Sequence, residues 1–136
     1  LRGIAIRQDL TDEWKNRGIE EETDFAILTN EITKATFGKK VEEYKKFKGL
    51  SRKNQNLRDH MTDWELIFTM LGEKATTDIA VARASIGFEQ NKQTAQKGGQ
   101  ITHNARKELE SETGTSIVSE TNFLNLDKKR LINKKE

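Results

Sequence analysis

The chain contains no proline, and this absence constrains its fold more than any other single feature. Proline fixes φ and removes a backbone donor, so it is the strongest terminator of helices. Without proline, helices along these 136 residues end only at glycines and at capping residues. The nine glycines therefore mark the expected boundaries of a mainly helical chain.

In the first half of the chain, apolar residues recur three to five positions apart, as the buried face of a helix requires. We expect helices over 1–17 and about 22–35, followed by a short helix with Val41, Tyr44 and Phe47 on its apolar face. The predicted fold class is all-α or mainly α, a compact multi-helix domain with one long, glycine-interrupted helix near the C-terminus.

The most apolar segment lies in the second half of the chain. Thr62 has the character of an N-cap, and the apolar residues of 64–71 follow with helical spacing. Gly72 is expected to end or bend this helix, and a separate helix is expected over 76–86.

A long polar helix is expected over about 88–111, although Gly98 and Gly99 lie in its interior. Two glycines there cost about 2 kcal/mol relative to alanine. Either the helix kinks at that point or another backbone packs closely against it. Residues 116–119 have a weak strand pattern without an obvious partner strand, so we expect a β-bridge or a loop packed on a neighbouring element.

The length predicts a single helical domain over 1–126, or two small lobes over 1–50 and 51–126. The charged tail, 127–136, is expected to fray. Only 33% of the residues are hydrophobic. So thin a core favours burial of further surface against a second copy, and we expect a homo-oligomer.

Several classes of protein are disfavoured by composition. The chain has no cysteine, which excludes disulfides and thiolate metal sites. It has no apolar run long enough to cross a membrane and no pattern of a secretion signal, so we expect a cytoplasmic protein without membrane contact. Because the first residue is Leu1 rather than methionine, we expect a piece cut from a longer protein.

The strongest charge feature is the basic stretch 39–58, which has eight basic residues against two acidic ones. With Tyr44 and Phe47 interleaved, this stretch could bind phosphates and stack unpaired bases. The alternative is the solvated side of a short helix whose core stripe is Tyr44 and Phe47. The candidate nucleic-acid-binding residues are Lys39, Lys40, Lys45, Lys46, Lys48, Arg52, Lys53 and Arg58.

Other constellations are weaker. A helix-turn-helix fits 64–86 poorly, because Glu73 and Asp78 stand where apolar residues are needed. His60 and His103 lack the spacing of metal ligands, and no serine lies in a nucleophile elbow. We therefore expect neither an enzyme nor a cofactor or metal site.

The most distinctive part of the sequence is a set of blocks, of which the longest is NLRDHMTDWELIFTMLGE over 56–73. The others are TDFAILTN (23–30), KGL (48–50), TTDIA (76–80), GFEQNK (87–92), KGG (97–99), NARKELE (104–110), Thr113–Gly114 and Val118–Ser119. In residues and in order, these blocks resemble the C-terminal region of the DNA-damage-inducible protein D family over roughly 20–125.

The resemblance implies a role in the bacterial damage (SOS) response. Full-length members carry an N-terminal domain of the type found in baculovirus repeated-ORF proteins and phage antirepressors, which this chain lacks. The family supplies no catalytic motif. Our first hypothesis is a non-enzymatic module that contacts single-stranded DNA or a recombinase–DNA filament in recombination and repair. The second is a dimerisation module of an antirepressor-like DNA-binding protein.

Overall fold

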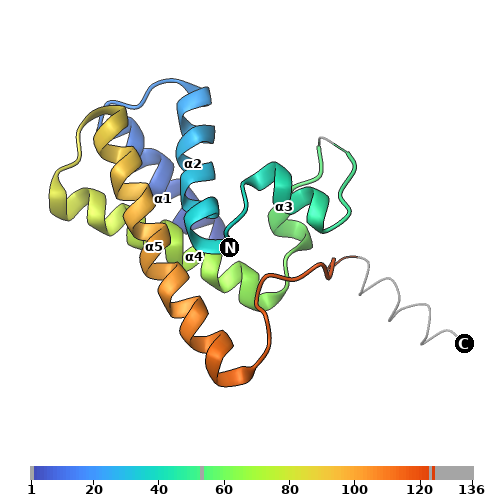
Figure 1. The fold of residues 1–136 in the computed structure, drawn as a ribbon. Helices are drawn as coiled ribbons and strands as arrows, with labels where there is room; N and C mark the ends of the chain where they lie inside the picture. The colour runs from blue at the N-terminus through green and yellow to red at the C-terminus, as the bar shows by residue number, and fades with distance from the viewer. Residues whose placement is uncertain (1, 53, 123, 125–136) are drawn as a thin grey trace, which may run out of the picture.

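The computed structural model describes residues 2–52, 54–122 and 124, and every regular element in that part of the chain is a helix (Figure 1). This confirms the predicted fold class. The elements are α1 (Arg2–Asn16), α2 (Glu22–Phe37), α3 (Val41–Phe47), the 3-10 turn η1 (Leu57–His60), α4 (Asp63–Arg83) and α5 (Gly87–Thr113).

The four long helices form a bundle in which α5 packs along both α2 and α4, and α1 packs against α4. The short helix α3 and the loop that follows it lie to one side of this bundle (Figure 1). No helix among the described residues is long and apolar enough to cross a membrane.

Helix boundaries follow the glycines in the first half of the chain, as predicted. Gly38 ends α2 with a left-handed backbone (φ 79°), and its N–H bonds to the carbonyl of Lys34. Only glycine adopts this conformation without a steric cost from a Cβ atom. Thr62 is the predicted N-cap of α4, and its hydroxyl accepts a hydrogen bond from the N–H of Glu65.

The expectation of two helices separated near Gly72 is wrong, because α4 runs without a break from Asp63 to Arg83. Gly72 lies against α2, where a Cβ atom would stand 3.1 Å from Cγ2 of Ile32 and 3.2 Å from Oγ1 of Thr36. Thr76 donates its hydroxyl to the carbonyl of Gly72 (2.7 Å) and begins no new helix. The glycine therefore permits close packing, and the helix-turn-helix alternative is excluded with the break.

Gly98 and Gly99 lie inside α5, and close approach of neighbouring helices explains both. A Cβ atom on Gly98 would stand 2.2 Å from Oγ1 of Thr76 on α4, and one on Gly99 would stand 2.5 Å from Cβ of Ala35 on α2. Helix α5 thus packs closely against α4 at Gly98 and against α2 at Gly99.

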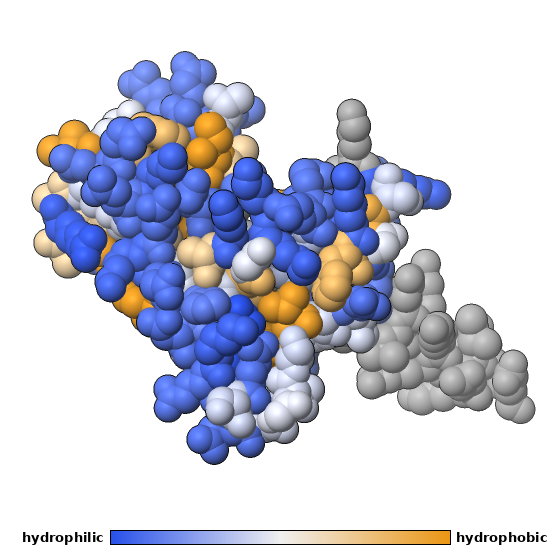
Figure 2. Space-filling model, viewed as in Figure 1, coloured by the Kyte–Doolittle hydropathy of each residue, from blue (hydrophilic) through white to orange (hydrophobic). Residues whose placement is uncertain are grey.

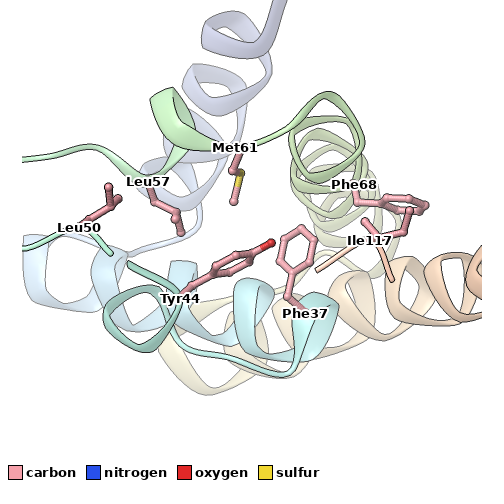
Figure 3. Close-up of a cluster of buried hydrophobic side chains, with 7 residues drawn as sticks. All are labelled: Phe37, Tyr44, Leu50, Leu57, Met61, Phe68 and Ile117. Atoms are coloured by element: carbon pink, nitrogen blue, oxygen red, sulfur yellow. The ribbon is translucent and has the colours of Figure 1, made fainter. Parts of the chain in front are cut away.

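Two hydrophobic clusters make up the core. One lies among α1, α2 and the first half of α5 and contains Leu10, Trp14, Ile19, Leu28, Ile32 and Ala95. The other joins the end of α2 to α3, η1, the start of α4 and the segment after α5 (Figure 3). It contains Phe37, Tyr44, Leu50, Leu57, Met61, Phe68 and Ile117. Both clusters include residues of α2, so this helix connects them.

The segment after α5 forms no strand or bridge among the described residues. It is a loop packed on its neighbours, one of the two alternatives expected, and Ile117 is buried in the second cluster. The charged tail, 127–136, lies outside the described residues.

Candidate nucleic-acid interface

The predicted basic stretch falls on α3 and the loops at its two ends, but its members differ in exposure. Lys40, Lys46 and Arg52 are exposed, whereas Lys39 and Lys45 are half-buried. Figure 2 shows hydrophilic side chains over most of the visible face of the molecule. Lys53 lies outside the described residues.

The two aromatic residues of α3 differ in burial: one belongs to the core and the other lies partly at the surface. Tyr44 is fully buried and packs edge-on against Phe37, with ring centroids 5.2 Å apart, so it belongs to the core. Phe47 is half-buried, and Nζ of Lys39 lies 4.5 Å from the centroid of its ring. Lys45 Nζ lies 3.7 Å from Oε1 of Glu42 on the same helix. The surface formed by α3 and its flanking loops is therefore basic overall, with Glu42 and Glu43 also exposed on the helix, and Tyr44 anchors it beneath.

Lys48 is buried and does not present its charge at the surface. Its ammonium group donates to Oε1 of Glu65 (2.6 Å) and to the carbonyls of Ser119 (2.8 Å) and Thr121 (2.7 Å). Because all three donors of the ammonium are used, Lys48 holds the segment after α5 against α3 and α4. Its placement favours a structural role over the predicted contact with nucleic acid.

Glu65 is the centre of this buried network. It accepts hydrogen bonds from the hydroxyl of Tyr44 and from the N–H groups of Thr62 (2.9 Å) and Ser119 (3.4 Å). Burial raises the pKa of Glu65 to about 7, against the opposing effect of the two N–H groups. Burial likewise lowers the pKa of Lys48 to about 8.

Arg58, the last predicted basic residue, lies in a cleft of about 590 Å³ next to α3. The walls of the cleft come from α1, α2, α3, α4 and the stretch 54–58 that precedes and enters η1. They include the basic residues Arg7, Lys45 and Arg58, the amides Asn54, Gln55 and Asn56, and the apolar residues Ile4, Ile32, Phe37, Val41, Leu57 and Met61.

Two arginines in this cleft share one carboxylate. Glu73 of α4, whose side chain is 3% exposed, accepts from NH1 of Arg7 (3.2 Å) through one oxygen and from NH2 of Arg58 through the other. Arg7 also donates to the hydroxyl of Thr29 (2.6 Å). Burial holds the pKa of Arg7 below its ordinary value, Glu73 opposes this and Arg58 adds to it.

Sequence reasoning missed Arg7, Glu65 and Glu73 as members of polar networks. Arg7 stands 66 positions from Glu73 in the chain, and Glu65 reads as an ordinary first-turn acid of α4. No spacing in the sequence connects residues that meet only through helix packing.

The histidines make side-chain contacts of an ordinary kind. Nδ1 of His60 lies 2.8 Å from Oδ1 of Asn122, and Nδ1 of His103 lies 3.1 Å from NH2 of Arg106. Within the described residues, no three His, Asp or Glu side chains are grouped to hold a metal ion.

Comparison with known protein families places most of the chain in a family. The model of the DinD C-terminal domain family matches residues 4–121, which include all five α-helices except the first two residues of α1. No curated protein and no solved structure matches the chain significantly. The match covers the bundle, the α3 face and the segment that Lys48 anchors. The chain therefore belongs to the DinD C-terminal domain family and is the helical domain of a protein of the DNA-damage-inducible class.

Proposed function

We propose that this domain is a non-enzymatic binding module of the bacterial damage response that contacts single-stranded DNA, free or within a recombinase–DNA filament. The observation that carries the proposal is the basic face of α3 and its flanking loops, formed by Lys39, Lys40, Lys45, Lys46 and Arg52. We call these five residues the α3 basic face. Lysine–phosphate contacts of this kind supply most of the affinity of non-specific DNA binding.

The geometry of the α3 basic face suits an irregular strand better than a duplex groove. Helix α3 has seven residues and is anchored through Tyr44, so it offers a short platform and not a long recognition helix. Single strands are bound by positive grooves that follow the backbone, with stacking on aromatic rings where these are exposed. The cleft beside α3 adds two arginines to the same side of the domain.

Fluorescence anisotropy of a labelled oligothymidine strand and a matched duplex, at low and at moderate salt, tests the proposal. We expect selective binding of the single strand that weakens steeply with salt. The double variant Lys40→Gln/Lys46→Gln should bind about tenfold less tightly and reduce the salt slope by about 1.4, because each phosphate contact on a single strand contributes about 0.7.

The matched control is Lys15→Gln/Lys97→Gln, which removes two exposed lysines from α1 and α5. We expect it to bind like the unaltered chain. A parallel titration with a recombinase-coated strand shows whether the filament is the preferred form. Absence of binding to the strand, the duplex and the filament at both salt concentrations would refute the proposal.

A second candidate function, dimerisation, is favoured by an exposed apolar stripe on α4. Trp64, Ile67 and Leu71 are 41–50% exposed and lie three and four positions apart on one face. The stripe continues with Lys74 and Asp78, which form an ion pair. An exposed apolar stripe of this kind favours burial against a second copy of the domain.

Light scattering during gel filtration at high micromolar concentration tests this candidate. We expect a dimer that Leu71→Lys converts to a monomer, while Ile27→Lys, an equally exposed position on α2, leaves it intact. A monomer at that concentration would eliminate dimerisation as a function of this domain.

A further inference from the structure

The cleft between the bundle and α3 carries more positive charge than its own residues neutralise. Its lining contains the cations Arg7, Lys45 and Arg58 but only one carboxylate, Glu73. Glu73 already bonds to both arginines. Even with Lys45 paired to Glu42, the two arginines outnumber the one carboxylate between them, so the site keeps a net positive charge.

The arginines retain donors for a further acceptor. A guanidinium carries five N–H donors in a planar fork. Within the described residues, Arg7 directs NH1 to Glu73 and NH2 to Thr29, and Arg58 directs NH2 to Glu73. Phosphate oxygens match this fork geometry, and two guanidinium groups held by one carboxylate are preorganised for such an anion.

The other walls of the cleft suit a nucleoside. Ile4, Ile32 and Leu57 supply apolar surface, and the amides of Asn54, Gln55 and Asn56 supply donors and acceptors. The volume, about 590 Å³, lies in the usual range for small-ligand pockets, about 300–1,000 Å³.

We infer that this cleft binds one nucleotide unit of a DNA strand, with its phosphate on the donors of Arg7 and Arg58 that Glu73 leaves free and its base and sugar against the apolar walls. This deepens the proposed function and rests on it: the α3 basic face follows the strand, and the cleft holds one of its nucleotides. Lys45 contributes to both, because it lies on α3 and lines the cleft.

Nuclear magnetic resonance titration with deoxythymidine monophosphate is the first test. We expect shifts in the backbone amides of 29–33 and 54–58 and in the Nε signals of Arg7 and Arg58. Inorganic phosphate should shift the arginine signals alone, and thymidine, which has no phosphate, should bind at least tenfold more weakly. The comparison separates a site for a whole nucleotide from a site for any phosphate.

Two substitutions with opposite expected effects sharpen the test. Arg58→Gln should weaken binding of the nucleotide about tenfold, because it removes a charged donor. Glu73→Gln should strengthen binding severalfold, because it removes the competing carboxylate while keeping the shape of the side chain. A purely structural role of the Arg7–Glu73–Arg58 group predicts no strengthening in this variant.

The matched controls are Arg83→Gln and Asp78→Asn, which make the same charge changes at exposed positions of α4. We expect neither to alter nucleotide binding. Thr33→Phe fills the cleft from α2 without changing the charge and leaves the Arg7–Glu73–Arg58 group in place. We expect this variant to lose nucleotide binding.

The outcomes distinguish the inference from the proposed function. Single-strand binding that shifts the lysines of α3 and leaves the cleft unchanged would overturn the nucleotide site and retain the α3 basic face. No strand binding, with nucleotide shifts confined to the cleft, would support the nucleotide site and refute the wider interface. Equal affinity for thymidine and its monophosphate would overturn the inferred role of the two arginines.

Discussion

At the scale of single residues, the glycine pair in α5 shows how a locally unfavourable choice serves the packing of the whole bundle. Glycine inside a helix costs about 1 kcal/mol relative to alanine. At Gly98 and Gly99 any side chain would overlap atoms of Thr76, Ala35 or Ile32. The close approach of three helices outweighs the loss of helix propensity.

Gly98→Ala is expected to destabilise the domain by about 1–3 kcal/mol, because the new methyl group would overlap the backbone and hydroxyl of Thr76. Gly3→Ala is the control, since a Cβ atom there would meet only the flexible side chain of Met70 at 3.3 Å. We expect that control to be neutral or slightly stabilising. Urea unfolding followed by circular dichroism measures both, and equal effects at the two positions would contradict the packing argument.

The buried pair Lys48–Glu65 is a second feature of this scale. Lys48→Met should cost about 3–5 kcal/mol near pH 7.5, between the pKa values of the two groups, because it leaves the Glu65 carboxylate buried without its counter-ion. The cost should shrink at pH 5, where Glu65 takes up a proton and needs no counter-ion. Urea unfolding at the two pH values measures this, with Lys46→Met on the exposed side of α3 as the control. An equal cost at both pH values would show that the loss comes from the hydrogen bonds of Lys48 to the carbonyls of Ser119 and Thr121 and not from its pairing with the Glu65 charge.

The raised pKa of Glu65 also makes stability depend on pH. The folded chain releases the Glu65 proton at about pH 7, whereas the unfolded chain releases it near 4.5. Between these values the folded state binds more protons, so the contribution of Glu65 to the free energy of unfolding falls as pH rises, by of order 3 kcal/mol across the window. Glu65→Gln cannot titrate, so the difference between the two chains should change over this range. Parallel pH profiles would contradict the assignment.

At the scale of elements, the start of α4 contains a residue, Glu65, that both caps the helix and forms a tertiary ion pair. Thr62 and Glu65 form a reciprocal capping box, visible in the sequence as a threonine followed three residues later by a glutamate. The same glutamate then turns out to be the buried partner of Lys48. The glutamate of a capping box usually lies in solvent, but here the Glu65 side chain is buried in the core.

Thr62→Ala should therefore destabilise the domain by about 1 kcal/mol, because the N–H of Glu65 loses its acceptor. Ser111→Ala, at an exposed position in the last turn of α5, should have no measurable effect. Thermal unfolding compares the two variants. A loss well above 2 kcal/mol would show that Thr62 supports the buried network as well as the helix end.

At the scale of the whole molecule, two hydrophobic clusters share the same long helices, so we expect them to unfold together. Trp14 lies in the first cluster and Met61 in the second. In a Trp64→Phe background, Trp14 fluorescence reports the first cluster alone. Met61→Ala should cost about 2–5 kcal/mol and shift the Trp14 transition and the loss of helix by the same amount. A Trp14 transition that kept its original midpoint would show two independent lobes.

The family match and the two hydrophobic clusters both extend over most of the described chain. Residues 4–121 match the DinD C-terminal domain, so the resemblance recognised in blocks of sequence extends over nearly the whole described bundle. The division into lobes at residue 50, one of the predicted alternatives, does not coincide with the clusters. The second cluster takes Phe37 and Tyr44 from one side of that position and Leu57 and Ile117 from the other.

The sequence by itself determined the local features: the helical class, the approximate bounds of the first two helices, the short helix after them, the N-cap at Thr62 and the long helix with its glycine pair. These depend on periodicity, capping and glycine conformation, which act over a few residues. Only the tertiary structure decided that Gly72 lies inside α4, that Lys48 is buried on Glu65, and that Arg7 and Arg58 meet at Glu73. Those outcomes depend on which helices pack together, and the side-chain pairs involved join residues 15 to 66 positions apart in the chain. A pattern over a few neighbouring residues cannot identify partners so far away in the chain.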